Sequence, residues 1–369
     1  MVSETAPNFP DATLHHGAQR KNGRVPELDL LRFIAASAVV IYHFTYRPLL
    51  NGAISTQAFG AVQSSSRFGY LGVNLFFIIS GFVILWSSQG RTASEFVASR
   101  FARLYPTFWI CVIITTLVLA SAGRFSEISP RIVALNLTMV PRLLGTPYLD
   151  GVYWTLFVEM KFYALVFAVL LTRTMRYVEW ILGAWLVACA AGAIGVSPHW
   201  VDSLALAPFG PFFISGCIVY MIRSRGASIT RVAALLLSGA LSVLLAIDQQ
   251  AEFMQSVTPT STSTVICVIV GFHAVFLAIA VTPRILPDSR TWYLLGTLTY
   301  PLYLLHSQIG KIVLAKTYSV TPLWPALVVA LAVVYALAAA VAKVSERRLS
   351  KNLHNWLLAT LERRAPAAT

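Results

Sequence analysis

Long apolar runs, separated by short polar or charged segments, set the pattern of this chain. A helix needs roughly 20 mostly apolar residues to cross about 30 Å of hydrocarbon, and runs of about that length predict spanning helices. We read ten of them, at 28–46, 70–88, 104–122, 151–172, 178–195, 203–222, 229–247, 262–281, 291–314 and 322–344. The apolar stretch at 131–143 is too short to span, so it predicts a re-entrant or interfacial segment.

The composition agrees with a membrane chain. Of its 369 residues, 57% are hydrophobic and only 12% are charged, and the mean hydropathy of +0.70 is far above that of a soluble domain. The predicted fold class is therefore all-α, a polytopic membrane helical bundle of about ten helices surrounded by the lipid bilayer. We expect an N-terminal tail at 1–27, one membrane domain at 28–345 and a C-terminal tail at 346–369.

The basic residues indicate how the bundle is oriented. The net charge is +13, and most Lys and Arg side chains lie on the side of the spans that holds the N-terminus. Because cytoplasmic loops retain positive charge, we expect both termini in the cytoplasm and the chain in the cell inner (plasma) membrane. The basic residues are dispersed among short loops and form no patch, which argues against a nucleic-acid partner.

Arg32 and His43 are ionisable residues of the first span. Such groups are costly in lipid unless they face a polar interior or a partner. Eleven steps of about 100° bring the two to nearly the same helix face, roughly 16 Å apart along the axis. This layout suits a reaction whose reactants arrive from opposite faces of the membrane. Alternatively, Arg32 snorkels to the interface and His43 only hydrogen-bonds a neighbouring helix.

The segment EFVASRFARLYP carries a pair of arginines. Arg100 and Arg103 fall at i and i+3, on one face of a short helix that Pro106 interrupts or begins anew. Two guanidinium groups on a cytoplasmic face suit a phosphate-rich ligand such as coenzyme A. Arginines are also expected wherever a cytoplasmic loop re-enters lipid, so the spacing alone leaves both interpretations open.

Other polar residues in the spans are further candidates for function. Glu159 shares a helix face with Tyr163, and its carboxylate could orient a catalytic histidine, hold a sugar hydroxyl, bind a basic partner or be structural. Asn74 offers an amide in the second span. His306 and His273, taken alone, are more typical of packing histidines that hydrogen-bond within the bundle.

The cysteines give no sign of a metal site. The four of them sit singly in apolar spans, without CxxC or Cys/His clustering: Cys111, Cys189, Cys217 and Cys267. We therefore expect them to be packing residues, and we expect no metal to be bound.

Five segments, taken in order, resemble the acyltransferase-3 family of integral membrane acyltransferases, which includes O-antigen, exopolysaccharide and Nod-factor acetyltransferases and macrolide acyltransferases. They are LDLLRFIAASAVVIYHF at 28–44, GVNLFFIISGFVI at 72–84, RFARLYP at 100–106, WTLFVEMKFY at 154–163 and YPLYLLH at 300–306. The resemblance runs from about residue 28 to 345, and the combination is far more specific than any one segment. The first segment looks most like the exopolysaccharide and O-antigen branch.

The resemblance implies a membrane O-acyltransferase. Its donor would be acetyl-CoA or another acyl-CoA, and its acceptor a hydroxyl of a cell-envelope or exported carbohydrate. The site residues expected on this basis are His43 and Glu159 for catalysis, Arg32, Arg100 and Arg103 for the acyl-CoA, and Asn74, Tyr163 and His306 for substrate contacts. His43 would act as a general base or as a nucleophile, and the sequence leaves both open. Residues 346–369 are too few for the SGNH esterase-like domain of some relatives, so we expect a stand-alone transferase.

The alternative class is a transporter or exporter of a lipid-linked sugar or small molecule. Such a protein would also need about ten helices and buried charges, and it would show discontinuous helices and repeat symmetry. Inspection of the sequence reveals no internal repeat. Transport gives no reason for the Arg/His spacing, the RxxR and the Glu motif to occur together, so acyl transfer is favoured.

Overall fold

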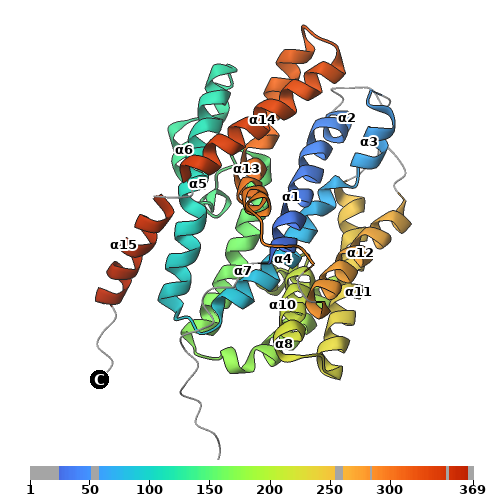
Figure 1. Ribbon diagram of the computed structural model, residues 1–369, viewed down its shortest axis with the longest axis vertical. Coiled ribbons are helices and arrows are strands. Elements are labelled where there is room, and N and C mark those ends of the chain that lie inside the picture. The colour runs from blue at the N-terminus through green and yellow to red at the C-terminus, as the bar shows by residue number, and fades with distance from the viewer. Residues whose placement is uncertain (1–24, 51–57, 254–260, 283–284, 346–348, 365–369) are drawn as a thin grey trace, which may run out of the picture.

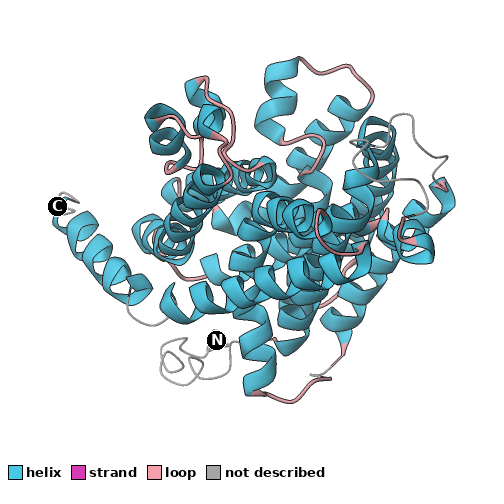
Figure 2. Cartoon of the chain, turned by 90° about the horizontal axis from the view of Figure 1, so that it is seen from above, coloured by secondary structure: helices cyan, strands magenta, loops and turns pink. Residues whose placement is uncertain are grey.

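The computed structural model describes residues 25–50, 58–253, 261–282, 285–345 and 349–364. Within these ranges every regular element is a helix (Figure 2). The all-α prediction is therefore confirmed. The long helices lie side by side, and α15 (Leu349–Arg364) lies at the edge of the bundle against α5 (Ala93–Ser121) (Figure 1).

Each of the ten predicted spans corresponds to a helix. These are α1 (Pro26–Ile41) with the π-helical turn Tyr42–Tyr46, α4 (Gly72–Ser88), α5, α7 (Trp154–Leu171), α8 (Val178–Ala193), α10 (Gly210–Arg225), α11 (Ile229–Phe253), α12 (Thr262–Val281), α13 (Arg290–Tyr318) and α14 (Leu323–Ser345). Among the described residues, eight helical stretches are long and apolar enough to cross a membrane. The two predicted spans outside that set are α8, which has 16 residues, and α13, which carries His306 and Lys311. The chain is a multi-pass membrane protein.

Short helices lie at the two ends of the bundle. We call the end at which α1 begins the near end, and the end that holds α2 (Arg47–Leu50) and α3 (Gly60–Ser66) the far end (Figure 1). The stretch at 131–143 falls in α6 (Pro130–Asn136) and a 3₁₀ turn from Pro141, and neither is long enough to span. Which end faces the cytoplasm stays a prediction.

Close packing of α4 on α10 depends on two glycines. A Cβ atom at Gly81 of α4 would overlap the Phe213 carbonyl oxygen, and one at Gly216 of α10 would overlap the Ile78 carbonyl oxygen. Small residues allow helix backbones in a membrane to approach in this way. The short α9 (His199–Ala205) precedes α10.

Helix α5 runs without a break through Pro106, so the prediction that this proline ends or restarts a short helix is wrong. A capping box begins the helix, in which the Thr92 hydroxyl accepts from the Glu95 N–H and the Glu95 carboxylate accepts from the Thr92 N–H. Spanning helices tolerate internal proline because neighbouring helices support the freed backbone groups, and α7, α13 and α14 pack on α5. Arg100 and Arg103 therefore stand on the early turns of one 29-residue helix.

The first span departs from the regular helix that its apolar pattern predicts. After α1 the chain widens into the π-helical turn Tyr42–Tyr46, in which the Arg47 N–H donates to the Tyr42 carbonyl five residues earlier. The Val39 carbonyl accepts from the Tyr42 N–H and also lies 2.9 Å from His43 Nδ1. Apolar periodicity identifies the buried face but not such a local change of register, which is frequent at functional sites.

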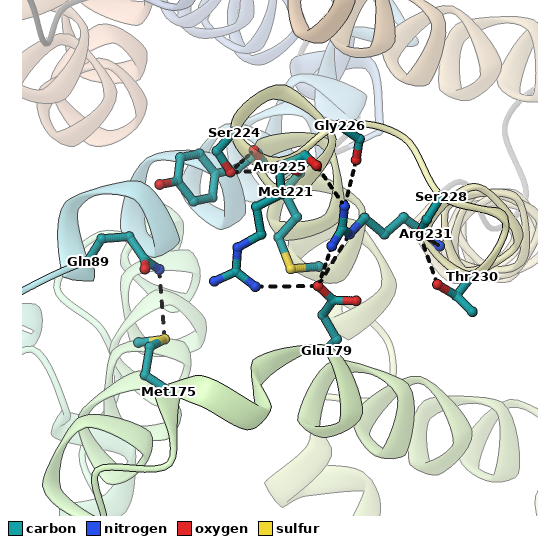
Figure 3. A network of polar contacts seen from close by, with 11 residues as sticks. Gln89, Met175, Glu179, Met221, Ser224, Arg225, Gly226, Ser228, Thr230 and Arg231 are labelled. Carbon is teal, nitrogen blue, oxygen red and sulfur yellow. Dashed lines mark hydrogen bonds and ion pairs between the residues drawn. The ribbon is translucent and has the colours of Figure 1, made fainter. Parts of the chain in front are cut away.

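An ion-pair cluster at the near end joins three helices (Figure 3). Glu179, in the first turn of α8, pairs with Arg231 of α11 at 2.7 Å and with Arg225 of α10 at 3.4 Å. Arg231 also donates to the Gly226 carbonyl at 2.7 Å. The cluster fixes the near ends of α8, α10 and α11 relative to one another.

His273 of α12 has the packing role that its isolated position suggested. Its Nδ1 lies 2.8 Å from the Ile269 carbonyl oxygen, and its Nε2 lies 3.0 Å from the Ser215 hydroxyl of α10. That hydroxyl is 2.8 Å from the Ser238 hydroxyl of α11. Hydrogen bonds between membrane helices contribute about 0.6 kcal/mol each, so these three side chains together hold α10, α11 and α12 in register.

Candidate active site

A cavity of about 560 Å³ lies among α1, α4, α5, α7 and α13, and we call it the inner cavity. It draws residues from helices far apart in the sequence. Several of these residues were candidates from the sequence, and those candidates are polar groups that lipid would not tolerate. The charged or phenolic lining residues that concern the site are Arg32, Arg100, Arg103, Asp29, Glu159 and Tyr163.

The two arginines of α5 have unequal surroundings. Arg100 is 9% exposed, its Nη2 donates to the Ser99 hydroxyl at 3.2 Å, and its buried Nε has no acceptor among the described residues. Arg103, one turn further along α5, is exposed. Because a buried donor without an acceptor costs about 1–3 kcal/mol, this face of the inner cavity is suited to a ligand that brings an oxyanion.

Glu159 lines the inner cavity and not the one that His43 lines. Its Oε1 accepts from the Tyr163 hydroxyl at 2.6 Å and from the Ser80 hydroxyl at 3.0 Å. Arg32 lies close enough to interact with it electrostatically. Of the roles that the sequence left open for Glu159, this geometry favours partnership with Arg32 over orientation of His43.

A second cavity, of about 250 Å³, lies toward the far end, and we call it the outer cavity. His43 lines it, with Arg47 from α2 and Lys311 from α13. Its other polar or aromatic lining residues are Tyr42, Tyr70, Asn74, Trp154, Gln249, Tyr303 and Ser307. Asn74 is 2% exposed and donates to Gln249 Oε1 at 3.5 Å. In the part of the chain that is described, no group of three or more His, Cys, Asp or Glu is arranged to hold a metal ion.

His43 and His306 are in direct contact, although 263 residues separate them in the sequence. Their ring centroids lie 4.8 Å apart, and His306 Nε2 is 3.2 Å from His43 Nδ1. His306 is fully buried, whereas His43 is partly exposed to the outer cavity. The sequence predicted that His306 contacts the substrate. This geometry instead favours a role in which His306 hydrogen-bonds and positions the His43 ring.

Hydrogen bonds to the backbone indicate which ring nitrogens carry protons. A carbonyl oxygen only accepts, so His43 Nδ1, 2.9 Å from Val39 O, and His306 Nδ1, 2.7 Å from Tyr303 O, are both donors. In a neutral His306 ring, Nε2 then holds a lone pair and accepts from His43 Nδ1–H. His43 Nε2 keeps its own lone pair, and no described residue hydrogen-bonds it. It is a nitrogen that can take a proton or attack a carbonyl carbon.

Val73 and Tyr303 line both cavities and form the partition between them. The Thr155 hydroxyl donates to the Tyr303 hydroxyl at 3.0 Å, which fixes that ring in place. Arg32 lines the inner side and His43 the outer side, with a rise of roughly 16 Å between them along the first span. A long, narrow molecule held by the arginines would extend toward this partition.

Three further residues of this region gave no functional signal in the sequence. Arg47 and Lys311 lie toward span ends, where basic residues are common in any case. Asp150 is fully buried, and its carboxylate accepts from the Val152 N–H at 3.2 Å and from the Gln308 N–H at 2.8 Å. It thereby fastens the loop before α7 to α13. The signal that could have identified it is its position directly before an apolar span, where a carboxylate caps a helix.

Comparisons with known proteins agree on one family. The family model described as an acyltransferase domain (acyltransferase 3) matches residues 25–343. The chain is similar to acyltransferase MdmB of Streptomyces mycarofaciens, with 29% identity over 102 residues, 27% of this chain and 26% of that protein. It is similar to nodulation protein 10 of Rhizobium leguminosarum bv. viciae, with 28% identity over 194 residues, 47% of this chain and 51% of that protein.

A further similarity is to peptidoglycan O-acetyltransferase OatA of Listeria monocytogenes serovar 1/2a, with 27% identity over 100 residues, 25% of this chain and 13% of that protein. The matches span about half the length of these curated relatives or less. No solved structure matches the chain. The family match includes both paired histidines and the three arginines of the inner cavity, and the chain therefore belongs to the acyltransferase-3 family of membrane acyltransferases.

Proposed function

We propose that this chain is an O-acyltransferase that takes an acetyl or other short acyl group from acyl-CoA and delivers it to a hydroxyl of a cell-envelope or exported carbohydrate. The near end would face the cytoplasm, where acyl-CoA is made, and the chain would lie in the cell inner membrane. The basic residues at the near end support this orientation. The acceptor would reach the outer cavity from the other side.

The inner cavity suits the donor. Coenzyme A carries phosphate groups, and the exposed Arg103 and the half-satisfied Arg100 offer guanidinium donors on one helix face. Arg32 adds a third positive charge along the same cavity. With the phosphates there, the extended pantetheine arm would carry the thioester toward Val73 and Tyr303, at the partition before His43.

His43 Nε2 would perform the chemistry by one of two routes. As a general base it takes the proton of the acceptor hydroxyl, the oxygen attacks the thioester carbonyl carbon, and the C–S bond breaks to release the coenzyme A thiolate. As a nucleophile it attacks that carbon itself and the C–S bond breaks to release the coenzyme A thiolate; the alcohol oxygen then attacks the acyl carbon, the bond from that carbon to Nε2 breaks, and the alcohol proton passes to the freed nitrogen. On either route the ring becomes positively charged. Its Nδ1–H, shared between Val39 O and His306 Nε2, is placed to stabilise that charge.

The observation that carries the proposal is the lone pair of His43 Nε2. Both hydrogen bonds to this ring involve Nδ1, so Nε2 has no partner among the described residues, and the ring lines the outer cavity beside the partition that the donor would approach. A histidine that served packing alone would have both nitrogens satisfied, as His273 has. The contrast between the two rings supports a reactive role for His43.

Complementation of a deletion strain tests the proposal. Surface and exported glycans from cells that carry the wild-type chain, His43→Gln or the exposed-site control His199→Gln are compared by mass spectrometry. We expect ester-linked acyl groups with the wild type and the control and none with His43→Gln, at equal amounts of inserted protein. Full acylation by His43→Gln would contradict the catalytic role, and unchanged glycans in the deletion strain would contradict the proposed acceptor class.

A further inference from the structure

The outer cavity has a marked charge imbalance. Its lining includes two basic side chains, Arg47 and Lys311, and no acidic one. Both are half-buried, and neither forms an ion pair with a described carboxylate. Withdrawing a charge from water is costly unless a partner compensates for it. A cavity with two cations and no counter-ion of its own presents a positive potential to whatever enters it.

Asp150, the carboxylate near this cavity, already accepts hydrogen bonds from the backbone. Asp150 interacts electrostatically with Lys311. Both of its carboxylate oxygens, however, accept backbone N–H groups, from Val152 and from Gln308. Arg47 faces the Tyr42 hydroxyl, which is a neutral partner. One carboxylate beside two cations leaves a net positive charge at the outer cavity.

The two cations have related positions relative to the paired histidines. Arg47 follows His43 by four residues, and Lys311 follows His306 by five residues on α13. With a rise of about 1.5 Å per residue, the backbone of each basic residue lies roughly 6–8 Å beyond that of its histidine along the helix, toward the far end. An anion between Arg47 and Lys311 would therefore lie further toward the far end than a hydroxyl at His43 Nε2.

The rest of the lining limits what the cavity can hold. A volume of about 250 Å³ is below the roughly 300–1,000 Å³ of sites for drug-sized ligands, so it takes one small unit and not a chain of several. Tyr42, Tyr70 and Trp154 offer aromatic surface with polar tips, and Asn74 and Gln249 offer amides. Such a mixture suits a single sugar residue.

We propose that the outer cavity takes an acidic sugar residue, whose carboxylate or phosphate binds Arg47 and Lys311 while one of its hydroxyls faces His43. The inference rests on the proposed function, because it names the class of acceptor for that reaction. It also predicts regioselectivity, since the two cations would fix the anionic group and thereby determine which hydroxyl faces His43.

Binding of matched sugars to the full chain in lipid nanodiscs tests this. The probes are methyl β-D-glucoside, methyl β-D-glucuronide and glucose 1-phosphate, which share one ring and differ in charge. We expect the charged probes to bind about ten- to a hundredfold more tightly than the glucoside. Preference for the glucuronide would identify a carboxylated sugar as the source of the anion, and preference for glucose 1-phosphate a phosphorylated one.

Charge-removing variants locate the effect. Lys311→Met should reduce the preference for charged probes over the glucoside, because only Arg47 then remains to bind the anion, and Lys311→Arg should retain it. Lys316→Met is the matched control, because Lys316 is exposed on the same helix outside the cavity. A wild type that binds no charged probe more tightly than the glucoside would overturn the proposal. Equal effects of Lys311→Met and Lys316→Met would overturn it as well.

Turnover of acetyl-CoA by the same samples separates this inference from the proposed function. His43-dependent loss of acetyl from acetyl-CoA, together with indifference to sugar charge, would leave the acyltransferase proposal standing and end this one. If Lys311→Met lowers kcat equally with neutral and charged acceptors, the cation acts on the reacting atoms and not on an anionic substrate. A larger rise in KM for charged acceptors than for neutral ones is the expected result.

Discussion

Removing the nitrogen behind His43 gives the sharpest test of how the reactive imidazole works. His306→Leu keeps a similar volume but removes the acceptor that lies 3.2 Å from His43 Nδ1. A hydrogen bond to a charged group is worth about 1.5–3 kcal/mol, and the His43 ring is charged in the transition state of either route. The full loss would lower kcat by about 10- to 150-fold.

The structure indicates that the fall in kcat for His306→Leu lies in the lower part of this range. Val39 O remains as a second acceptor for the same Nδ1–H, 2.9 Å away, so part of the stabilisation survives. We therefore expect kcat for His306→Leu to fall by about 10- to 50-fold. The KM for acetyl-CoA should not change, because His306 lines neither cavity.

The assay is steady-state acetyl transfer from radiolabelled acetyl-CoA to isolated envelope glycan, with the enzyme in nanodiscs. Thermal unfolding of each variant is measured alongside, since His306 is fully buried and its loss also leaves the Tyr303 carbonyl without this donor. His306→Gln, whose amide oxygen can accept from Nδ1–H, should recover part of the kcat. Wild-type kcat in a folded His306→Leu variant would refute the positioning role, as would a loss that appears only in the KM for acetyl-CoA.

Three further predictions concern the donor site and the packing of the bundle. Arg100→Gln and Arg103→Gln should each raise the KM for acetyl-CoA by about tenfold or more, with little change in kcat. Arg91→Gln, in the exposed loop before α5, should leave this KM unchanged, and equal effects of all three variants would contradict a specific contact with the donor. Gly81→Ala should lower the free energy of unfolding by about 1–3 kcal/mol, because its Cβ would overlap the Phe213 carbonyl. Gly183→Ala on α8, with open space around it, should be neutral or stabilising. Thermal unfolding in nanodiscs compares the two variants, and equal midpoints would contradict the close approach of α4 and α10. Glu179→Gln should lower the free energy of unfolding by no more than about 1 kcal/mol, and by less at high salt, because the ion-pair cluster in Figure 3 is partly exposed. A larger loss that does not depend on salt would show that the cluster is effectively buried.

The sequence predicts the helices well because the membrane imposes a simple rule on composition. All ten apolar runs form helices, since a spanning backbone must satisfy its hydrogen bonds within the segment. The sequence predicts local irregularities within the helices poorly. Pro106 does not break α5, and the π-helical turn Tyr42–Tyr46 interrupts the first span, because both outcomes depend on neighbouring helices and not on residue type alone.

The grouping of the site residues needed three dimensions. Arg32, Arg100 and Arg103 meet in one cavity, as their shared charge and position suggested. The partner of His43 could not be read from spacing, because the contact with His306 joins helices 263 residues apart. Lys311 resembled any basic residue near the end of a span, and only its place on the cavity wall separates it from Lys316.

Sided transfer across a vesicle membrane tests the central claim most directly. The chain is reconstituted in sealed vesicles, protease access to the N-terminus defines which way each population faces, and labelled acetyl-CoA and an impermeant acidic glycan are supplied on chosen sides. We expect the glycan to be labelled when acetyl-CoA meets the near end and the glycan meets the far end, and we expect no labelling with His43→Gln. Labelling only when both substrates are on the same side, or labelling that persists in His43→Gln, would contradict transfer between two cavities through this histidine.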